Sequence, residues 1–340
     1  MTKVESSIEE GTVRVGASLG MLEVLKQFDV DPVELLHEEG IDPEIFSNPD
    51  NRVPFRFRTR LIQTCSERTG CPHFGLLVGQ KGNLASLGLI GYVAINCHNA
   101  ESALRSLINY FYVQSQGSVA SLSIEGDQAL FRYTALNADT PGINHIHEAA
   151  VAIMLNIMRQ LFYPDWRPVE VCFAHKKPLD IAPYRQFFRT ALRFDAGVNG
   201  LYFPASMLNK TIKGADSELL RILKKQIDQL ELDFEDDFAR QVRQLLCTSF
   251  YAGQNSAEEV ASLFSIHTRT LHRRLKECGT SFREISDSCR FDIAKQLLQN
   301  SSVDLIRIAE MVNYADVRTF SRAFERWSGM TPTQWRKRNC

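Results

Sequence analysis

Four basic side chains share one face of a helical pattern over residues 268–276. They fall at positions i, i+3, i+4 and i+7, and they are Arg269, His272, Arg273 and Lys276. Leu271 and Leu275 lie one turn apart on the opposite face, where they would be buried. A guanidinium fork matches guanine edges and phosphates, and a helix fits the major groove of B-DNA. The pattern therefore predicts a helix that reads DNA.

A second helix, expected over residues 316–327, repeats this arrangement. Phe320 and Phe324 face the core, and the outward stripe holds Arg318, Arg322 and Arg326. The candidate DNA contacts on the two helices are Thr268, Arg269, Thr270, His272, Arg273, Lys276, Arg318, Thr319, Arg322 and Arg326. A single charged helix face is commonly just a solvated surface, whereas two matched stripes favour DNA binding.

The first of these helices is expected to be the second half of a helix-turn-helix unit over residues 256–276. Ser256 is placed as its N-cap, and Glu259 at the third helical position completes a capping box. The small Ala261 permits close crossing of the two helices, and the turn is expected at residues 265–267. This local framework would hold the basic stripe outward.

The second unit is expected over residues 304–327. Asp304 is placed to cap its first helix, and the turn starts at Asn313, where such turns usually have glycine. Asn tolerates the left-handed backbone better than most residues do. Thr331 and Pro332 then open a closing helix. The sequence thus predicts two complete units.

The segment between the units, residues 281–299, has apolar residues at helical spacing. A helix of that length spans roughly 29 Å. One turn of B-DNA advances about 34 Å, so one rigid helix would hold both readers in successive major grooves of one duplex. The length of this segment therefore explains why the two units lie in one module.

These residues make the C-terminal part resemble the DNA-binding domain of the AraC/XylS family of bacterial transcription regulators. The motifs that carry the resemblance are Glu258-Glu259-Val260-Ala261, Arg269-Thr270-Leu271, Arg273-Arg274-Leu275, Gly279-Thr280-Ser281-Phe282-Arg283, Phe320-Ser321-Arg322-Ala323-Phe324 and Gly329-Met330-Thr331-Pro332. The resemblance implies base contacts from the first reader helix and a phosphate-positioning role for Arg322. Ser265 and Asn313 depart from the usual turn glycines, and His267 replaces a frequent Ser cap.

The N-terminal part mixes helices and short strands, including a hairpin around residues 125–128. This mixture predicts an α+β sensor domain with a largely antiparallel sheet, joined to an all-α C-terminal domain. The motifs Leu89-Ile90-Gly91-Tyr92 and Asp165-Trp166-Arg167-Pro168 are similar to those of ornithine-utilisation-type regulators of this family, whose N-terminal region is an arabinose-binding-type sensor domain. The expected division is a flexible tail (1–15), an effector-binding and dimerisation domain (16–212), a linker helix (213–235) and the DNA-binding domain (236–340).

Charge and cysteine usage agree with this division. Residues 236–340 hold 16 Lys and Arg against 12 Asp and Glu, a net of +4, and the remaining residues hold 23 against 28, a net of −5. The eight cysteines show no C-x-x-C spacing, which argues against a zinc finger. The acidic start lacks a signal-peptide pattern, and the longest apolar stretch is too short to span a bilayer. A cytoplasmic protein without a cofactor or a metal is expected.

Three groups of the N-terminal part have a second interpretation. His145 and His147 have metal-compatible spacing, although a pair at the start of a helix is the simpler interpretation. An arginine cluster could hold an anionic effector or form a solvated helix face, and it comprises Arg52, Arg56, Arg58 and Arg60. Arg132 and Tyr133 on the hairpin could line a pocket.

The expected function is a sequence-specific transcription regulator, an activator on the grounds of the resemblance, controlled by a small effector. Its expected partners are double-stranded promoter DNA, the effector, RNA polymerase and a second copy of the chain. One alternative is an N-terminal domain that only oligomerises. Another is a DNA-repair enzyme that transfers an alkyl group to a cysteine, which needs an activated thiolate among Cys65, Cys71, Cys97 and Cys172.

Overall fold

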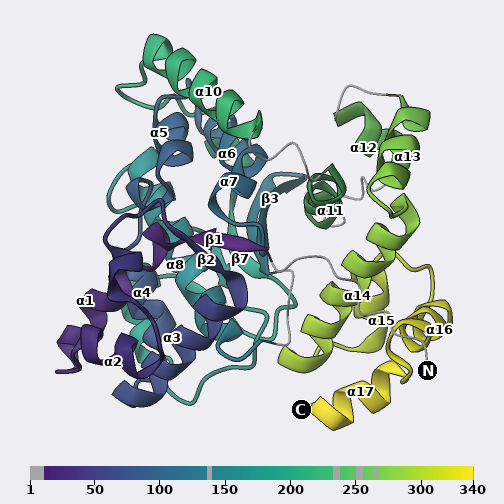
Figure 1. Cartoon of the computed structure of the whole chain (residues 1–340), viewed down its shortest axis with the longest axis horizontal. Helices are drawn as coiled ribbons and strands as arrows, with labels where there is room; N and C mark the ends of the chain where they lie inside the picture. The colour runs from purple at the N-terminus through teal and green to yellow at the C-terminus, as the bar shows by residue number, and fades with distance from the viewer. Residues whose placement is uncertain (1–10, 136–139, 233–237, 250–255, 264–266, 340) are drawn as a thin grey trace.

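The computed structural model describes residues 11–135, 140–232, 238–249, 256–263 and 267–339 (Figure 1). An N-terminal α+β domain occupies the left of the view, and an all-helical C-terminal region occupies the right. The predicted fold class is confirmed. The predicted boundary at 235/236 lies outside the described residues. Among the described helices, none is long and apolar enough to cross a membrane.

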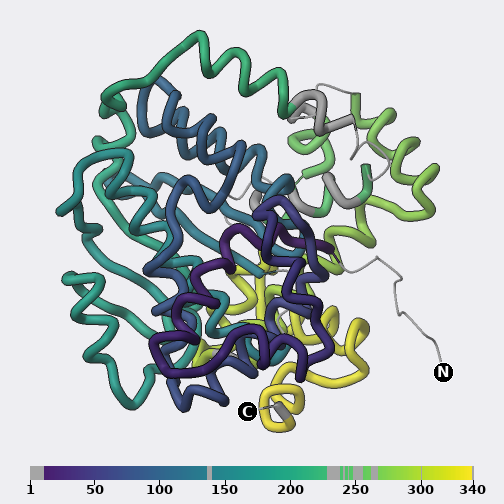
Figure 2. The backbone as a smooth tube through the Cα atoms, turned by 60° about the vertical axis from the view of Figure 1, so that its left-hand side comes forward, coloured from purple at the N-terminus to yellow at the C-terminus, as the bar shows by residue number. Residues whose placement is uncertain are grey.

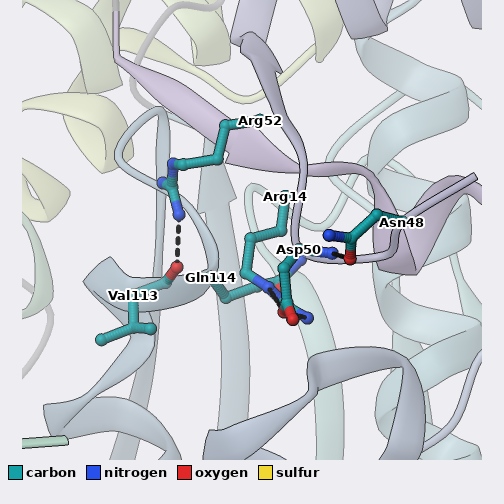
Figure 3. Close-up of polar contacts among 6 residues, drawn as sticks. All are labelled: Arg14, Asn48, Asp50, Arg52, Val113 and Gln114. Carbon is teal, nitrogen blue, oxygen red and sulfur yellow. Dashed lines mark hydrogen bonds and ion pairs between the residues drawn. The ribbon is translucent and has the colours of Figure 1, made fainter. Parts of the chain in front are cut away.

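The first described residues of the chain form a strand within the segment that the sequence assigned to a flexible tail. Residues 1–10 of the predicted tail lie outside the described part, but β1 (Thr12–Arg14) pairs antiparallel with β2 (Arg52–Pro54). Val13 is fully buried, and Arg14 pairs with Asp50 and donates to the Gln114 side chain at 2.9 Å (Figure 3). Residues 12–14 of the expected tail thus form a strand, because long-range partners hold them in place.

Helices make up most of the N-terminal domain. The α-helices are α1 (Gly20–Gln27), α2 (Pro32–Glu38), α3 (Phe55–Thr69), α4 (Phe74–Lys81), α5 (Leu89–Ile95), α6 (Ala100–Asn109), α7 (Phe111–Gln114), α8 (Ile143–Leu161), α9 (Ala182–Phe188) and α10 (Ser217–Leu232). The 3₁₀ helices are Val15–Ser18, Pro43–Phe46, Ala85–Leu87 and Ala205–Asn209. The apolar α8 packs closely on α4. Gly75 and Gly79 of α4 permit this approach, since a Cβ at either position would clash with the backbone of α8.

One sheet of five strands organises the domain. Its strands are β3 (Ser118–Glu125), β4 (Gln128–Ala135), β5 (Glu170–Cys172), β6 (Ala191–Arg193) and β7 (Asn199–Pro204), in the order β3-β4-β7-β5-β6. All neighbours are antiparallel except β5 and β6. The hairpin predicted around residues 125–128 joins β3 to β4, and Gly126 takes the left-handed backbone of its turn (φ 62°). Helix α8 contacts β4 and β7.

The C-terminal region contains only helices in its described part. They are α11 (Phe238–Ser249), α12 (Ala257–Leu263), α13 (Thr268–Glu277), α14 (Phe282–Asn300), α15 (Leu305–Met311), α16 (Val317–Ser328) and α17 (Pro332–Asn339). Helices α12 and α13 form the first predicted unit, and α15 and α16 form the second. Residues 265–266 of the first predicted turn lie outside the described part.

The predicted helix starts of this region are present. The Ser256 backbone N–H donates to Glu259 at 2.9 Å and the Glu259 N–H to Ser256 Oγ at 3.1 Å, so the capping box is formed. Asp304 accepts from the Arg307 N–H at 2.7 Å. Thr331 accepts from the Gln334 N–H at 3.3 Å. Side-chain oxygens thus satisfy backbone donors that have no partner inside the helix.

The connecting helix α14 has 19 residues, as expected, and its apolar face is buried. A second capping box between Ser281 and Glu284 fixes its first turn. Helix α11 packs along it, and the buried Arg243 pairs with Asp292 and donates to Ser288 Oγ at 2.8 Å. This contact links α11 to α14, and removing one partner alone would leave a buried charge unpaired at a cost of about 3–5 kcal/mol.

The outer face of the sheet meets the C-terminal region. Val119 on β3 packs in one cluster with Val242 and Leu246 of α11. The side-chain amide nitrogen of Gln296 on α14 lies 3.0 Å from Nε2 of the buried His147 on α8. Burial lowers the pKa of His147 to about 3, so the imidazole is neutral and its Nε2 accepts from the amide. These contacts join the two parts through β3 and α8.

The turn of the second unit generates a stability prediction. Asn313 has the left-handed backbone that its position predicted (φ 56°). Replacing Asn313 by Ala should lower the free energy of unfolding by about 1 kcal/mol, because Ala keeps the crowded Cβ and loses the short polar side chain whose local hydrogen bonding lets Asn adopt this region. The Gly variant, which has no Cβ, should be more stable than the Ala variant. Urea unfolding followed by circular dichroism measures both, and equal stability of the two variants would contradict this turn geometry.

Candidate nucleic-acid interface

Helix α13 presents its predicted basic stripe to solvent. Four of the predicted contacts are exposed, and they are Arg269, His272, Arg273 and Lys276. Leu271 and Leu275, on the other face, are fully buried against the helices of this region. Burial of one face therefore fixes which side of the helix the basic residues occupy.

The N-terminal end of α13 is held by its own cap. His267 Nδ1 accepts the backbone N–H of Arg269 at 3.2 Å, so the His that replaces the usual Ser still caps the helix. Thr268 and Thr270 are half-buried beside it. These two threonines are thus less available to DNA than the arginine between them.

Neighbouring side chains restrain two members of the stripe. Arg273 lies 3.8 Å from Glu277 one turn further on, and both side chains are exposed. The His272 ring contacts the Phe282 ring edge-on, at a centroid distance of 6.4 Å. An exposed i,i+4 pair contributes only about 0.3–0.5 kcal/mol, so Arg273 can exchange Glu277 for a base edge or a phosphate.

Helix α16 carries the second basic stripe on the face opposite its buried phenylalanines. Arg318 and Arg322 are exposed, and Phe320 and Phe324 are fully buried. Thr319 is exposed as well, but its hydroxyl donates to Asp316 at 2.8 Å. Hydrogen bonds from Thr319 hold the pKa of Asp316 below its usual value, which strengthens the cap at neutral pH.

Arg326 has an ion-pair partner on another helix. Its Nη2 lies 3.0 Å from Asp287 Oδ2 on α14, and its guanidinium lies 5.8 Å from the ring centroid of Trp327. Asp287 is 39 positions away in the sequence, so no local pattern pointed to this pair. Arg326 therefore braces α16 against α14, and Arg318 and Arg322 are the better placed for DNA.

The two reader helices lie on the side of the C-terminal region that faces away from the N-terminal domain (Figure 1). Helix α14 runs between the two units, and 19 residues give it a length of about 29 Å. This is close to the roughly 34 Å between successive major-groove segments on one face of a duplex. The arrangement suits contact with two such segments.

Two groups of candidate residues in the N-terminal domain, the histidine pair and the arginine cluster, can now be placed in the structure. His145 and His147 lie in the first turns of α8, as the helix-start interpretation predicted. In the described residues, no group of three or more His, Cys, Asp or Glu side chains is arranged to hold a metal.

The arginine cluster of the N-terminal domain is divided between different environments. Arg52 donates to the Val113 carbonyl oxygen at 2.7 Å (Figure 3). Arg56 and Arg60 are exposed, but Arg58 is buried, so the solvated-face interpretation is wrong for that arginine.

Comparisons with known proteins agree with this fold. The model of the arabinose-binding domain of AraC transcription regulators matches residues 30–212, and that of a helix-turn-helix domain matches residues 260–338. The first match alone covers more than half of the chain. The chain is a DNA-binding transcription regulator, with an N-terminal domain of the arabinose-binding type. It belongs to the AraC family.

The similarity to two named regulators extends over nearly the whole chain. The chain is 25% identical over 334 residues to the ornithine utilization regulator of Pseudomonas aeruginosa, covering 96% of each chain. It is 26% identical over 320 residues to the HTH-type transcriptional regulator VirS of Mycobacterium tuberculosis, covering 93% of this chain and 94% of the relative. The crystal structure of transcriptional regulator CdpR from Pseudomonas aeruginosa aligns over 92% of this chain and 98% of its own, with 21% identity and a TM-score of 0.45.

The exposed Arg273 generates a test of base recognition. Replacing Arg273 by Ala should remove about 1–3 kcal/mol of discrimination between the preferred site and a site with one altered base pair, because a bidentate base contact is lost. Competition gel shifts on sites selected from a random DNA library measure this. Lys337→Ala on α17, which removes an exposed charge outside the stripes, is the matched control. Wild-type site preference in Arg273→Ala would contradict the assignment.

Proposed function

We propose that the chain is a sequence-specific promoter-binding regulator controlled by a small effector. The observation that carries the proposal is the pair of outward basic helices, α13 and α16, in two units that one capped helix, α14, joins. Each presents exposed arginines above a buried apolar face. This spacing supports simultaneous contact with two successive major-groove segments.

The two stripes have different proposed roles. The α13 side chains Arg269, His272, Arg273 and Lys276 read base edges, with Thr268 and Thr270 beside them. Arg322 positions the second unit on the phosphate backbone, with Arg318 and Thr319 next to it, and Arg326 contributes mainly through its ion pair with Asp287. Base contacts carry sequence preference, while phosphate contacts fix register and give salt-dependent affinity.

The N-terminal domain is proposed to bind the effector and to join two copies of the chain. Effector binding would favour one placement of the C-terminal region on the outer face of the sheet, and DNA affinity and effector affinity would then change each other by the same factor. We propose that the complex activates transcription from nearby promoters through contact with RNA polymerase, in the bacterial cytoplasm where promoter DNA lies. The named regulators to which the chain is similar support a role in gene control.

The cysteines give no support to the alkyl-transfer alternative. All four candidate cysteines are buried. Burial raises the pKa of Cys65 and of Cys172 to about 12, and it also raises the pKa of Cys71. An acceptor cysteine needs a depressed pKa, because the thiolate is the nucleophile. The environments of these three thiols therefore oppose that chemistry.

Two of the three arginines of α16, Arg322 and Arg326, allow a matched test of phosphate contact. Replacing Arg322 by Ala should weaken binding to all sequences alike and reduce the slope of log affinity against log salt by about 1, because one fewer counterion is released. Arg326→Ala should change the slope less, since Arg326 is already paired with Asp287. Fluorescence anisotropy over a salt series measures both slopes. Equal slopes in wild type and Arg322→Ala would overturn the assignment.

A further inference from the structure

A cavity of about 50 Å³ lies inside the N-terminal domain, between α8 and the inner face of the sheet. Apolar side chains form most of its wall, and they include Leu107, Phe111, Phe131, Ile153, Met154 and Ile157. This face of the sheet is distinct from the outer one, because residues alternate along a strand. Ser118 and Ala120 line the cavity, while Val119 between them packs on α11.

A buried cation stands in this apolar wall. Arg58, on α3, lines the cavity and is only 9% exposed. In the part of the chain that the structure describes, no carboxylate and no hydrogen-bond acceptor is paired with its guanidinium. Burial lowers the pKa of Arg58, which reflects the cost of holding this charge away from water. Burying a charge without a counter-ion is unfavourable, so the site favours an incoming anion.

The polar groups around Arg58 are also donors. Burial raises the pKa of Tyr133, so the phenol is protonated, and Ser118 is hydrogen-bonded to it. The Gln114 amide oxygen accepts from Arg14 (Figure 3). Gln114 also lines the cavity, and its NH₂ group is a further donor. A guanidinium with neutral donors beside it matches a carboxylate, which only accepts hydrogen bonds.

We propose that this cavity is the effector site and that its ligand is a small monocarboxylate with an apolar tail. The carboxylate would pair with Arg58 and accept from Tyr133, and the tail would lie among the side chains of α8 and β4. A free sugar, with hydroxyl groups on every side, would leave polar groups against this apolar wall at a cost. The inference rests on the proposed effector control and adds the chemical class of the effector.

The cavity is connected to the DNA-binding region by two direct contacts. The Tyr133 ring meets the His147 ring edge-on, with centroids 6.2 Å apart. His147 in turn accepts from Gln296 on α14. A ligand that pulls the Tyr133 hydroxyl toward its carboxylate would therefore act on the helix that spaces the two DNA readers. The first contact lies inside the N-terminal domain, and the second crosses the boundary between the two parts of the chain.

Calorimetry on the full-length chain tests the ligand class. Straight-chain carboxylates from acetate to dodecanoate are titrated in parallel with the primary alcohols of equal length and with L-arabinose. We expect one range of chain lengths to bind, and the matching alcohols to bind at least about 30-fold more weakly because they lack the charge. Failure of every carboxylate to bind, equal binding of acids and alcohols, or binding of arabinose alone would overturn the proposal.

Two variants locate the site, and a third is the control. Arg58→Gln should lose at least about 30-fold in carboxylate affinity. Arg60→Gln, an exposed position on the same helix, should bind as wild type. Ala120→Val places two extra methyl groups at the wall on a strand that accepts β-branched residues, and it should shift the preference to shorter tails. Circular dichroism shows whether Arg58→Gln folds. If it does not, the tail-length preference of Ala120→Val tests the location of the site. Wild-type affinity in a folded Arg58→Gln, or an unchanged tail preference in Ala120→Val, overturns the assignment.

Gel shifts of the same proteins separate this inference from the proposed function. Site-specific DNA binding by a wild-type chain that binds no carboxylate would overturn the ligand class alone. Carboxylate binding by a chain without site preference on DNA would overturn the proposed regulator instead. Carboxylate binding that changes the affinity for DNA supports both.

Discussion

The connecting helix α14 sets both the distance and the rotation between the two DNA-facing helices, because α13 precedes it and α15 and α16 follow it without long intervening segments. Its first turn is fixed by the Ser281–Glu284 capping box, and its middle is tied to α11 by the buried pair of Arg243 and Asp292. A loop in its place would allow many spacings and would lose free energy on binding, since ordering each residue costs about 1–2 kcal/mol. Rigidity of this helix would therefore make the two proposed reader helices one binding surface.

The five-stranded sheet gives the N-terminal domain two faces with different tasks. One face, with Phe131 and Tyr133, encloses the cavity beneath α8. The other, with Val119, supports α11 of the DNA-binding region. A strand alternates its side chains between the faces, so a shift of β3 or β4 on ligand binding moves both surfaces together. Two discrete placements of this boundary, each favoured by a different ligand, would be enough for control without any long chain of contacts.

Local patterns predicted most of the DNA-binding half, because its elements are helices with caps and periodic apolar faces. Asn313 in the turn was correctly expected to adopt a left-handed backbone from its residue type and position alone. The failures involve long-range partners. Arg14 was assigned to a tail because its partner Asp50 and the strand beside it lie far along the chain, and the pairing of Arg326 with Asp287 has no local signal either. Arg58 on its own helix looks like its exposed neighbours, and only the packing of sheet and helices buries it.

The central claim is that α13 and α16 contact two major-groove segments of one duplex at the same time. Hydroxyl-radical footprinting of the full chain on its selected site tests this directly, combined with methylation interference at guanines. The account predicts two clusters of contacted guanines on one face of the duplex, about 10 base pairs apart. Arg273→Ala should abolish interference in one cluster, and Arg318→Ala should weaken contact only around the other. A single protected segment, or two segments affected equally by either substitution, would contradict the account.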